Sequence, residues 1–526
     1  MAQRRRHSFT TMPSLEAFSD VYEAGQPQVV STRLVGDLET PVSAYMKLSA
    51  DQPMSFLLES VEGGAVRGRY SVIGLAPDIV WRANGNVAQV NRNPRRRPDS
   101  FKKVAGSALK SLRTFLNDSK IDIPEGLPPM AAGVFGYMGY DTVRLVENLP
   151  NERTDILGVP DSLLMRPTVM VVFDAVTDEI IIMTPARPKA KQASDKAYAA
   201  AKRRLQAVVK ALETPLDIAS NMSSAGVSLD IDEVTSNTAP HEYMEMVDEA
   251  KEYIRAGDIF QVVLSQRFSA QFPLPPFALY RALRRTNPSP FLFYLDFNTF
   301  SLVGSSPEIL VRVRAGEVTI RPIAGTARRG ANFAEDELIA EQLLADPKER
   351  AEHLMLLDLG RNDVGRVAEI GSVKVTDKFI IERYSHVMHI VSNVIGKLNN
   401  KHDVIDALMA GFPAGTVSGA PKVRAMEIID ELEKDKRGPY AGCVGYFSAD
   451  GDMDTCIVLR TAVVKDGVMY AQAGAGIVYD SLPENEQQEC INKAKALIRA
   501  AEEAVRFAGG YPSKKPAGSN RGAFNR

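Results

Sequence analysis

Two pairs of glutamates, far apart in the chain, have the spacing and the chemistry of a metal site. Glu349 and Glu352 are three residues apart. Glu486 and Glu489 repeat that spacing near the end of the chain. Residues three apart leave the same face of an α-helix, so each pair can present its carboxylates together. Either pair alone would more often be a solvated helix face, but two such pairs on facing helices suit a hard divalent cation, and we predict a Mg²⁺ site.

Each glutamate pair needs a helix to position it. Asp346 can cap a helix, and Pro347 is tolerated in a first turn, where its missing N–H is not required. Apolar residues then recur at helical spacing, which predicts a buried stripe made of Ala351, Leu354, Met355 and Leu357. We expect the second pair to open the last helix, over about 484–505.

The remaining pattern predicts the α+β class. Short β-like runs come in clusters with hairpin spacing, which favours largely antiparallel sheets flanked by helices. A chain of 526 residues exceeds what one core usually supports, so we expect two domains or one large interleaved unit. The expected divisions are an N-terminal region at 15–185, a helix and linker at 186–238, a catalytic domain at 239–508 and a disordered tail at 509–526.

Composition narrows the possible partners and the compartment. A formal charge of −2 with 24% charged residues gives no reason to expect nucleic acid or an acidic membrane surface. Apolar runs stay below membrane-spanning length, and the N-terminus lacks the apolar core of a signal peptide. The three cysteines have neither metal-ligand spacing nor an even number for pairing. We therefore predict a reduced, cytoplasmic protein that binds neither nucleic acid nor membrane.

Two glycine-containing segments resemble cofactor loops only superficially. Gly474-Ala-Gly476 follows a predicted strand, but the third glycine of a dinucleotide fingerprint is missing. The alternative for this segment is a tight turn that offers backbone N–H groups to a carboxylate. In the segment 411–422, Pro421 replaces the last glycine of a phosphate loop, and no Ser or Thr follows Lys422.

Four motifs, taken in order, carry a resemblance to a known family. They are Arg321-Pro-Ile-Ala-Gly-Thr326, Lys348-Glu-Arg-Ala-Glu-His353, the segment 411–422 and Gln472-Ala-Gly-Ala-Gly476. Together they resemble the chorismate-utilising enzymes, and among these the large-subunit (component I) family of anthranilate synthases. The resemblance is strong over about 240–505 and weaker over 30–185. It implies the two-layer fold of that family, with its sheets largely antiparallel.

The resemblance also implies an activity and its partners. Such enzymes are lyases that convert chorismate and ammonia to anthranilate and pyruvate, the first committed step of tryptophan biosynthesis. A separate glutaminase subunit supplies the ammonia, in a heterotetramer of two large and two small subunits. No nucleophilic cysteine in a glutaminase-type elbow occurs in the sequence, which agrees with this division of labour. The resemblance further implies feedback inhibition by tryptophan.

Individual site residues follow from the same resemblance. Glu352 and Glu489 would bind Mg²⁺, supported by Glu349 and Glu486. Glu308 would protonate the departing C4 hydroxyl group. The residues around the substrate would be Gly325, Thr326, Tyr440, Arg460, Gly474, Ala475, Gly476 and Lys493, and His389 would assist the later loss of pyruvate.

Two positions favour one product over those of related enzymes. Isochorismate-type relatives have a lysine base where this chain has Gln261, and aminodeoxychorismate synthases have a lysine nucleophile where it has Ala324. With both lysines absent, ammonia would add directly at C2, and anthranilate would result. The alternatives are that another lysine, Lys422 or Lys493, supplies an amine, that the product is the aminodeoxy or isochorismate compound, or that the chain is a non-catalytic metabolite-binding regulator.

Two further segments resemble the walls of a tryptophan effector site. Leu57-Leu-Glu-Ser60 is the first and Asn287-Pro-Ser-Pro-Phe-Leu292 is the second. The predicted effector contacts are Glu59, Ser60, Asn287, Pro290, Phe291 and Leu292. Without the resemblance, these segments would be an ordinary strand edge and an ordinary proline turn.

Overall fold

The computed structural model describes most of the chain. The described residues are 10–49, 52, 54–62, 66–150, 152–216, 234–384 and 387–508. The predicted disordered tail at 509–526 lies outside them, as does most of the predicted linker.

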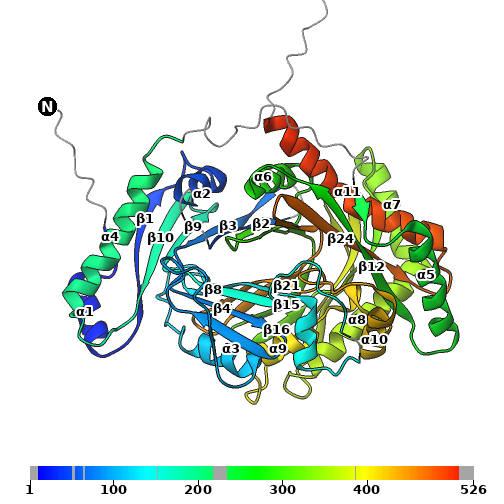
Figure 1. Cartoon of the computed structure of the whole chain (residues 1–526), viewed down its shortest axis with the longest axis horizontal. Helices are drawn as coiled ribbons and strands as arrows, with labels where there is room; N and C mark the ends of the chain where they lie inside the picture. The colour runs from blue at the N-terminus through cyan, green and yellow to red at the C-terminus, as the bar shows by residue number, and fades with distance from the viewer. Residues whose placement is uncertain are drawn as a thin grey trace, which may run out of the picture.

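The described strands form two twelve-stranded antiparallel sheets, stacked as two layers (Figure 1). The first sheet runs in the order β1 (Gln28–Val35), β10 (Glu179–Ala186), β9 (Val169–Asp174), β3 (Val66–Leu75), β2 (Ser55–Glu62), β13 (Phe291–Asp296), β14 (Ser301–Ser306), β23 (Thr461–Lys465), β24 (Val468–Ile477), β12 (Gln261–Gln271) and β11 (Thr235–Ser236), with β20 (Gly419–Ala420) paired to β12. The second sheet runs in the order β17 (Ile323–Arg328), β19 (Val387–Lys397), β16 (Glu317–Ile320), β15 (Ile309–Arg314), β22 (Met453–Ile457), β21 (Cys443–Ser448), β7 (Gly133–Met138), β8 (Ser162–Arg166), β4 (Ile79–Asn84), β5 (Val87–Asn91) and β6 (Lys102–Lys103), with β18 (Lys374–Arg383) beside β19. The predicted α+β sandwich of antiparallel sheets is confirmed.

Both sheets contain strands from both halves of the chain. In the first sheet β2 pairs with β13, so that Ser60 lies opposite Phe291. In the second sheet β7 pairs with β21. The rings of Phe56 and Phe135 stack between the two layers, with their centroids 4.6 Å apart. The two halves therefore share a continuous core.

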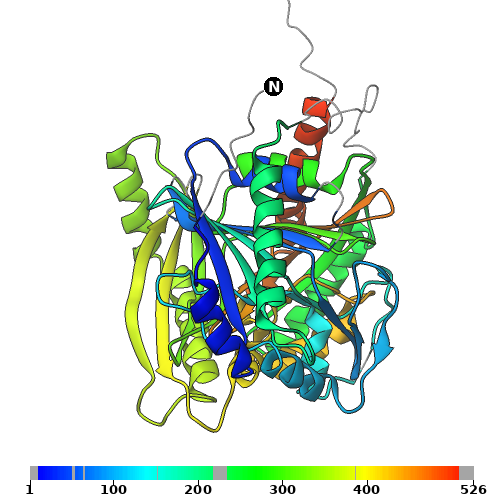
Figure 2. The same ribbon diagram turned by 90° about the vertical axis from the view of Figure 1, so that its left-hand side faces the viewer.

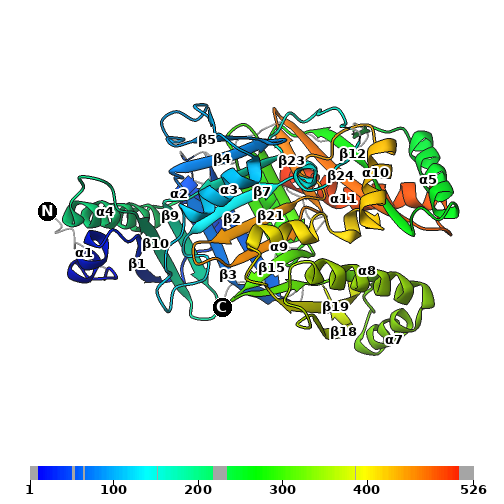
Figure 3. The same ribbon diagram turned by 90° about the horizontal axis from the view of Figure 1, so that it is seen from below.

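Helices cover the outer faces of the two sheets. They are α1 (Leu15–Glu23), α2 (Pro41–Ser49), α3 (Ala108–Asn117), α4 (Ser194–Leu212), α5 (Pro240–Arg255), α6 (Pro276–Thr286), α7 (Phe333–Ala345), α8 (Pro347–Gly365), α9 (Val404–Gly411), α10 (Lys422–Leu432) and α11 (Pro483–Ala508), with 3₁₀ turns η1 (Tyr140–Leu145) and η3 (Gly415–Val417). Helix α4 crosses the first sheet (Figure 2), while α3, α8 and α9 cover the second sheet from below (Figure 3). Within the described residues, no helix combines the length and the apolarity needed to cross a membrane.

Helix α8 begins where the sequence predicts, but it buries a different face. The Asp346 side chain caps the helix by accepting from the backbone N–H of Lys348 at 2.8 Å. The predicted buried stripe is wrong in part, because Leu354 is 54% exposed and Ala351 is exposed. The residues that are buried are His353, Leu356, Leu357, Gly360, Asp363 and Val364. The apolar pattern misleads because the face that packs on β17 and β19 also carries polar residues.

The segment 456–464 does not form one continuous strand. The chain forms β22 in the second sheet and then crosses to β23 in the first sheet. Between the two strands Arg460 has a φ of +48°, in the left-handed region that few residues other than glycine adopt. This bend turns the chain from one layer to the other and places Arg460 between them.

Candidate active site

The two glutamate pairs lie in the first two turns of α8 and α11, close enough to influence one another. Burial raises the pKa of Glu349, and the neighbouring Glu352 charge raises it further. Burial also raises the pKa of Glu352; Lys348 opposes that shift and the Glu489 charge adds to it. The pKa of Glu486 is raised by burial and by Glu489. Negative charge from two helices therefore converges in one place.

The chemistry of these four carboxylates fits a divalent cation. Like charges that raise one another's pKa are stabilised by a cation between them, and carboxylate oxygens are the ligands that Mg²⁺ prefers. Within the described residues, no three His, Cys, Asp or Glu side chains already stand at metal-binding distances from a common point. The donor set therefore has the right charge and atom type, while its final geometry depends on the cation.

Lys493 links the acidic pair on α11 to strand β24. Its Nζ donates to Glu489 Oε1 at 2.7 Å and to the backbone oxygen of Gly474 at 2.8 Å. Gly474 and Gly476 lie inside β24, opposite Ser265 and Val263 of β12, and not in the tight turn that the sequence left open. Strand continues there because the partner strand β12 runs the full length of this segment.

The glycines of β24 allow close approach of two predicted site residues. A β-carbon at Gly476 would lie 2.5 Å from Gln261 Nε2, and one at Gly474 would lie 2.9 Å from Tyr440 Oη. Strand β23 accompanies β24 only up to Ala471, so the far edge of the glycine segment faces the site instead of another strand. Gln261 also hydrogen bonds to Glu352, which connects this strand to the acidic pair on α8.

His389 is held in one tautomer by the backbone of Gly325, which lies in β17. Its Nδ1 lies 2.9 Å from the backbone oxygen of Gly325 and 3.1 Å from Thr326 Oγ1. A carbonyl oxygen only accepts, so Nδ1 carries the proton and Nε2 is left with a lone pair. Burial lowers the pKa of His389, which keeps the ring neutral and able to accept a proton. Gly325 itself has a φ of +65°, and a β-carbon there would lie 3.1 Å from Glu349 Oε2.

Glu308 is a buried carboxyl group with the properties of a general acid. The Thr416 hydroxyl lies 3.3 Å and 3.2 Å from its two carboxylate oxygens. Burial raises the pKa of Glu308 to about 8, although Thr416, the Ile323 backbone N–H and Arg460 each oppose the shift. At neutral pH this group is therefore mostly protonated, and it can donate a proton.

Arg460 offers a half-buried positive charge to an anion. Its Nη1 lies 3.4 Å from Ser289 Oγ, and within the described residues its guanidinium forms no ion pair with a carboxylate. Burial lowers its pKa, while Tyr384 and Glu308 nearby raise it. A half-buried arginine that forms no ion pair is suited to bind a substrate carboxylate.

Two residues of this site were missed by sequence reasoning. Thr416 contacts Glu308, and it lies in the 411–422 motif, which the sequence analysis tested only as a phosphate loop. The ring of Tyr384 meets His389 edge-on at 5.6 Å. The 411–422 motif could have indicated Thr416 as a site residue. No sequence pattern indicated Tyr384.

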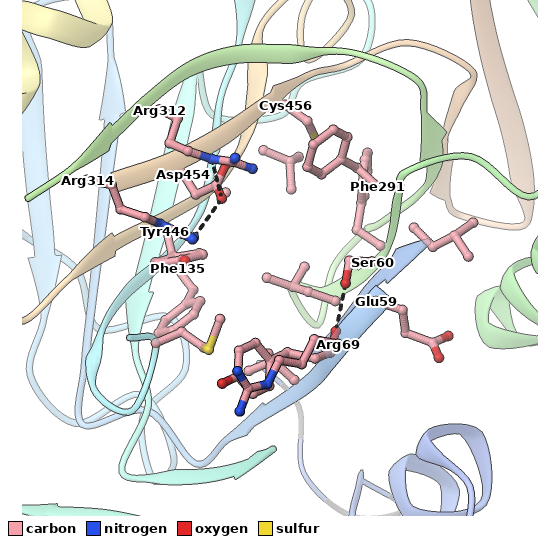
Figure 4. A pocket seen from close by; sticks show the side chains of 18 residues that line it. Glu59, Ser60, Arg69, Phe135, Phe291, Arg312, Arg314, Tyr446, Asp454 and Cys456 are labelled. Carbon is pink, nitrogen blue, oxygen red and sulfur yellow. Dashed lines mark hydrogen bonds and ion pairs between the residues drawn. The ribbon is translucent and has the colours of Figure 1, made fainter. Parts of the chain in front are cut away.

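The predicted effector residues lie at a separate cavity of about 430 Å³ between the two sheets (Figure 4). Four of them line it: Glu59, Ser60, Phe291 and Leu292. Ser60 points into the cavity, whereas the Glu59 carboxylate points away from it (Figure 4) and accepts from Tyr280 Oη at 2.5 Å and Arg284 Nε at 2.6 Å. The second sheet supplies a wall that the sequence did not indicate, made of Arg312, Arg314, Val444, Gly445, Tyr446, Asp454 and Cys456.

The other two effector residues lie beside this cavity. Pro290 lines a neighbouring cavity of about 540 Å³ that also contains Ser60, Phe291 and Tyr384. Asn287 follows α6, and its backbone N–H donates to Leu283 at 2.9 Å. Tyr384, which lines this neighbouring cavity, contacts His389, so one side chain lies between the cavity and the candidate active site.

Known proteins match this chain over most of its length. The chorismate binding enzyme family matches residues 40–499. Anthranilate synthase component 1 of Cereibacter sphaeroides is 55% identical over 94% of this chain and 99% of its own length. The Pseudomonas aeruginosa protein of the same name is 46% identical over 90% of this chain and 96% of its own.

Solved structures agree with these sequence matches. The crystal structure of anthranilate synthase component I from Streptococcus pneumoniae superposes with a TM-score of 0.71 at 39% identity, covering 88% of this chain and 98% of that one. The menaquinone-specific isochorismate synthase of Escherichia coli superposes with a TM-score of 0.67 at 20% identity, covering 93% and 99%. The second match is informative about the fold alone.

Proposed function

Because this chain belongs to the chorismate-binding enzymes, and within them to the anthranilate synthase component 1 family, we propose that the site between α8, α11 and β24 makes anthranilate from chorismate and ammonia. The reaction is of the lyase type and is the tryptophan-pathway step that the family name describes. The observation that carries the assignment is Glu308, a buried carboxyl group that stays protonated near neutral pH. Arg460, which forms no ion pair with a carboxylate among the described residues, lies near both Glu308 and the neutral His389.

Substrate binding follows from the charges of the site. Chorismate carries two carboxylates, and Arg460 with the open edge of β24 binds one of them. Glu352 and Glu489, supported by Glu349 and Glu486, hold Mg²⁺, and the bound cation supplies positive charge for the second carboxylate. Tyr440, Lys493, Gly325 and Thr326 border the ring between these two ends.

The chain's own groups then move the protons. Ammonia attacks C2, both ring double bonds shift, and the C4 hydroxyl leaves as water with the proton from Glu308. The added nitrogen loses one proton, which restores the proton that Glu308 gave up. In the second stage a base takes the C2 proton, enolpyruvate leaves C3 and becomes pyruvate on protonation, and the ring becomes aromatic. The free Nε2 of His389 assists this stage. Gln261 has no basic nitrogen, and its Oε1 is buried without a hydrogen-bond partner among the described residues, so it can accept from ammonia.

Product analysis tests this assignment. Chorismate, Mg²⁺ and ammonium are incubated with the chain, and the products are separated against authentic standards. Anthranilate as the main product supports the proposal. Isochorismate, salicylate or 4-amino-4-deoxychorismate would contradict it, and a chain that leaves chorismate unchanged would be a binding protein.

The component 1 name implies a partner, component 2, as the nitrogen source. We expect that partner to be a glutaminase, in a heterotetramer of two large and two small subunits. The purified chain then works with ammonium alone and uses glutamine only when the second subunit is added. Glutamine-dependent turnover by the chain alone would overturn this expectation. The three buried free cysteines, Cys443, Cys456 and Cys490, support a reducing, cytoplasmic location.

The cavity at Ser60 is the proposed site of tryptophan feedback. Its walls are apolar rings and aliphatic chains together with charged side chains such as Arg69, Arg312 and Arg314, which suits an aromatic amino acid with its carboxylate. Residues of the 15–185 region thus form the regulatory elements, together with the segment Asn287–Leu292.

A further inference from the structure

Arg437 hydrogen bonds to several segments that carry candidate site residues, but it is not itself a proposed substrate contact. The side chain is 2% exposed. Its Nη1 donates to the backbone oxygen of Val417 at 2.7 Å, and its Nη2 donates to that of Val263 at 2.6 Å. Glu433, also buried, pairs with it through Nε at 2.9 Å and Nη2 at 2.6 Å. One guanidinium thus joins η3, β12 and the residues after α10.

The two carbonyl groups that Arg437 binds belong to the segments that position the chemistry. Val417 follows Thr416, whose hydroxyl contacts Glu308. Val263 lies two residues after Gln261, just beyond Val262, where the pairing of β12 with β20 ends. Arg437 therefore joins η3 to β12 just beyond Val262–Gly419, the last residue pair between β12 and β20.

The partner Glu433 anchors this arrangement from the other side. Its Oε1 accepts from the backbone N–H of Ser265 at 2.7 Å and from Ser265 Oγ at 2.9 Å. The Arg437 guanidinium also lies 5.6 Å from the Tyr440 ring centroid, within cation–π range. A buried ion pair contributes little net stability once its desolvation is counted, so stability alone does not account for the arrangement.

We propose that Arg437 is a positioning residue for catalysis, which holds Thr416 against Glu308 and fixes that acid relative to Gln261. The inference rests on the proposed function, because the roles of Glu308 and Gln261 are assigned there. It predicts that disturbing Arg437 impairs the chemical steps more than it impairs substrate binding, since Arg460 and the glutamate pairs are left in place.

The substitution Arg437→Lys tests the proposal with the positive charge retained. A lysine ammonium cannot bind both carbonyl groups and Glu433 with the planar geometry of a guanidinium. We expect kcat to fall about 10- to 100-fold, the loss typical of a displaced catalytic group. The KM for chorismate should change by less than about threefold, since a loss confined to kcat marks interactions made in the transition state.

A pH measurement separates positioning from general damage. The Thr416 hydrogen bond lowers the pKa of Glu308, so its loss raises that pKa. Arg460 and the Ile323 backbone N–H also face Glu308, and they stay unchanged. The basic limb of the kcat profile should move to higher pH in both Arg437→Lys and Thr416→Val. The double variant should shift little further, because both changes act through the same bond.

Arg166→Lys is the matched control. Arg166 is a similarly buried arginine that binds the Asp78 carboxylate through two bonds of 2.8 Å and the backbone oxygen of Asp118 at 3.1 Å, all away from the site. It should lower the melting temperature and leave both kcat and the basic limb unchanged. Equal kcat losses in the two lysine variants, an unmoved basic limb, or additive effects in the double variant would overturn the proposal.

Two further measurements keep the result interpretable. If Arg437→Lys does not fold, Ser265→Ala weakens the same arrangement by removing one bond to Glu433, and it should shift the limb in the same direction. The Glu308 carboxyl can also be titrated by infrared spectroscopy, with its band assigned by its loss in Glu308→Gln. This readout needs no turnover, so a wild-type chain that makes no anthranilate refutes the proposed function while the Arg437 shift is still decided.

Discussion

Glu308 and His389 both lie near Arg460, yet burial affects their proton affinities in opposite directions. Burial disfavours the charged form of both groups, so the pKa of the carboxyl group rises while the pKa of the imidazole falls. The result is one protonated acid and one neutral base at the same pH. Such a division is what the two stages of the proposed reaction require.

The first prediction concerns the pH dependence of Glu308. A general acid acts only while protonated, so kcat should hold at neutral pH and fall as the pH rises past the pKa of about 8. Glu308→Gln removes the proton donor and should lower kcat about 10²- to 10⁴-fold while removing that limb. Asp174→Asn, at a buried carboxylate paired with Arg69 in the first sheet, should keep the wild-type profile. An unchanged limb in Glu308→Gln would assign the acid to another group.

The second prediction concerns Glu352 and the cation. Glu352→Gln removes one negative charge from the converging pairs, so the apparent affinity for Mg²⁺ should fall by about 10- to 100-fold or more. Mg²⁺ binding is measured directly by calorimetry and also by turnover against Mg²⁺ concentration. Glu317→Gln, at an exposed glutamate on β16, is the control and should behave as wild type. If both variants bind Mg²⁺ equally, the cation does not sit between α8 and α11.

At the scale of elements, local sequence patterns predicted those features, such as helix ends, that depend on neighbouring residues in the chain. The start of α8 followed from Asp346 and Pro347, because a cap depends only on its neighbours in the chain. The bend at Arg460 and the contact of Thr416 with Glu308 could not be predicted in this way. Both depend on the order of strands in two sheets, which joins residues more than 100 positions apart, such as Glu308 and Thr416 at a separation of 108. The family resemblance named the site residues that no periodicity indicates.

The third prediction concerns strand β2. Alternate residues of a strand face opposite sides, so Ser60 enters the cavity while Glu59 turns toward Arg284. Ser60→Phe should fill the cavity and relieve inhibition by tryptophan, with kcat in the absence of tryptophan within about twofold of wild type, since Ser60 is not one of the proposed catalytic, substrate or metal residues. Inhibition curves with tryptophan measure this, with phenylalanine as the control effector. A wild-type chain indifferent to tryptophan would remove the effector assignment.

At the scale of the whole molecule, the interleaving of the halves has a mechanical consequence. Each sheet passes through strands from before and after the segment 217–233, so neither half has a complete sheet of its own. Strand β2, which carries the proposed effector residues, pairs with β13, which pairs with β14, and β14 ends just before Glu308. The proposed effector residues on β2 and β13 lie in the same sheet as Gln261 of β12 and Gly474 of β24, which would give the proposed feedback a short physical route.

The last prediction tests this shared core through Phe56. Its fully buried ring fits over Gly74, where a β-carbon would lie 2.1 Å from the ring, and stacks on Phe135 of the second sheet. Phe56→Ala should cost about 3–5 kcal/mol of unfolding free energy, the usual range for deleting a buried phenylalanine ring. Because β2 pairs with β13, the loss should affect both halves at once.

Two probes can follow this unfolding in urea. Fluorescence of Trp81, the single tryptophan, reports on β4 in the N-terminal half, while anthranilate production reports on the catalytic residues after 239. The two transitions should coincide in wild type and move together in Phe56→Ala, as expected for one cooperative unit. Leu38→Ala, at a side chain 91% exposed, should leave both midpoints in place. If Trp81 instead unfolded at a lower urea concentration than activity was lost, the N-terminal strands would be a separable unit, and the shared-sheet route for feedback would fail with it.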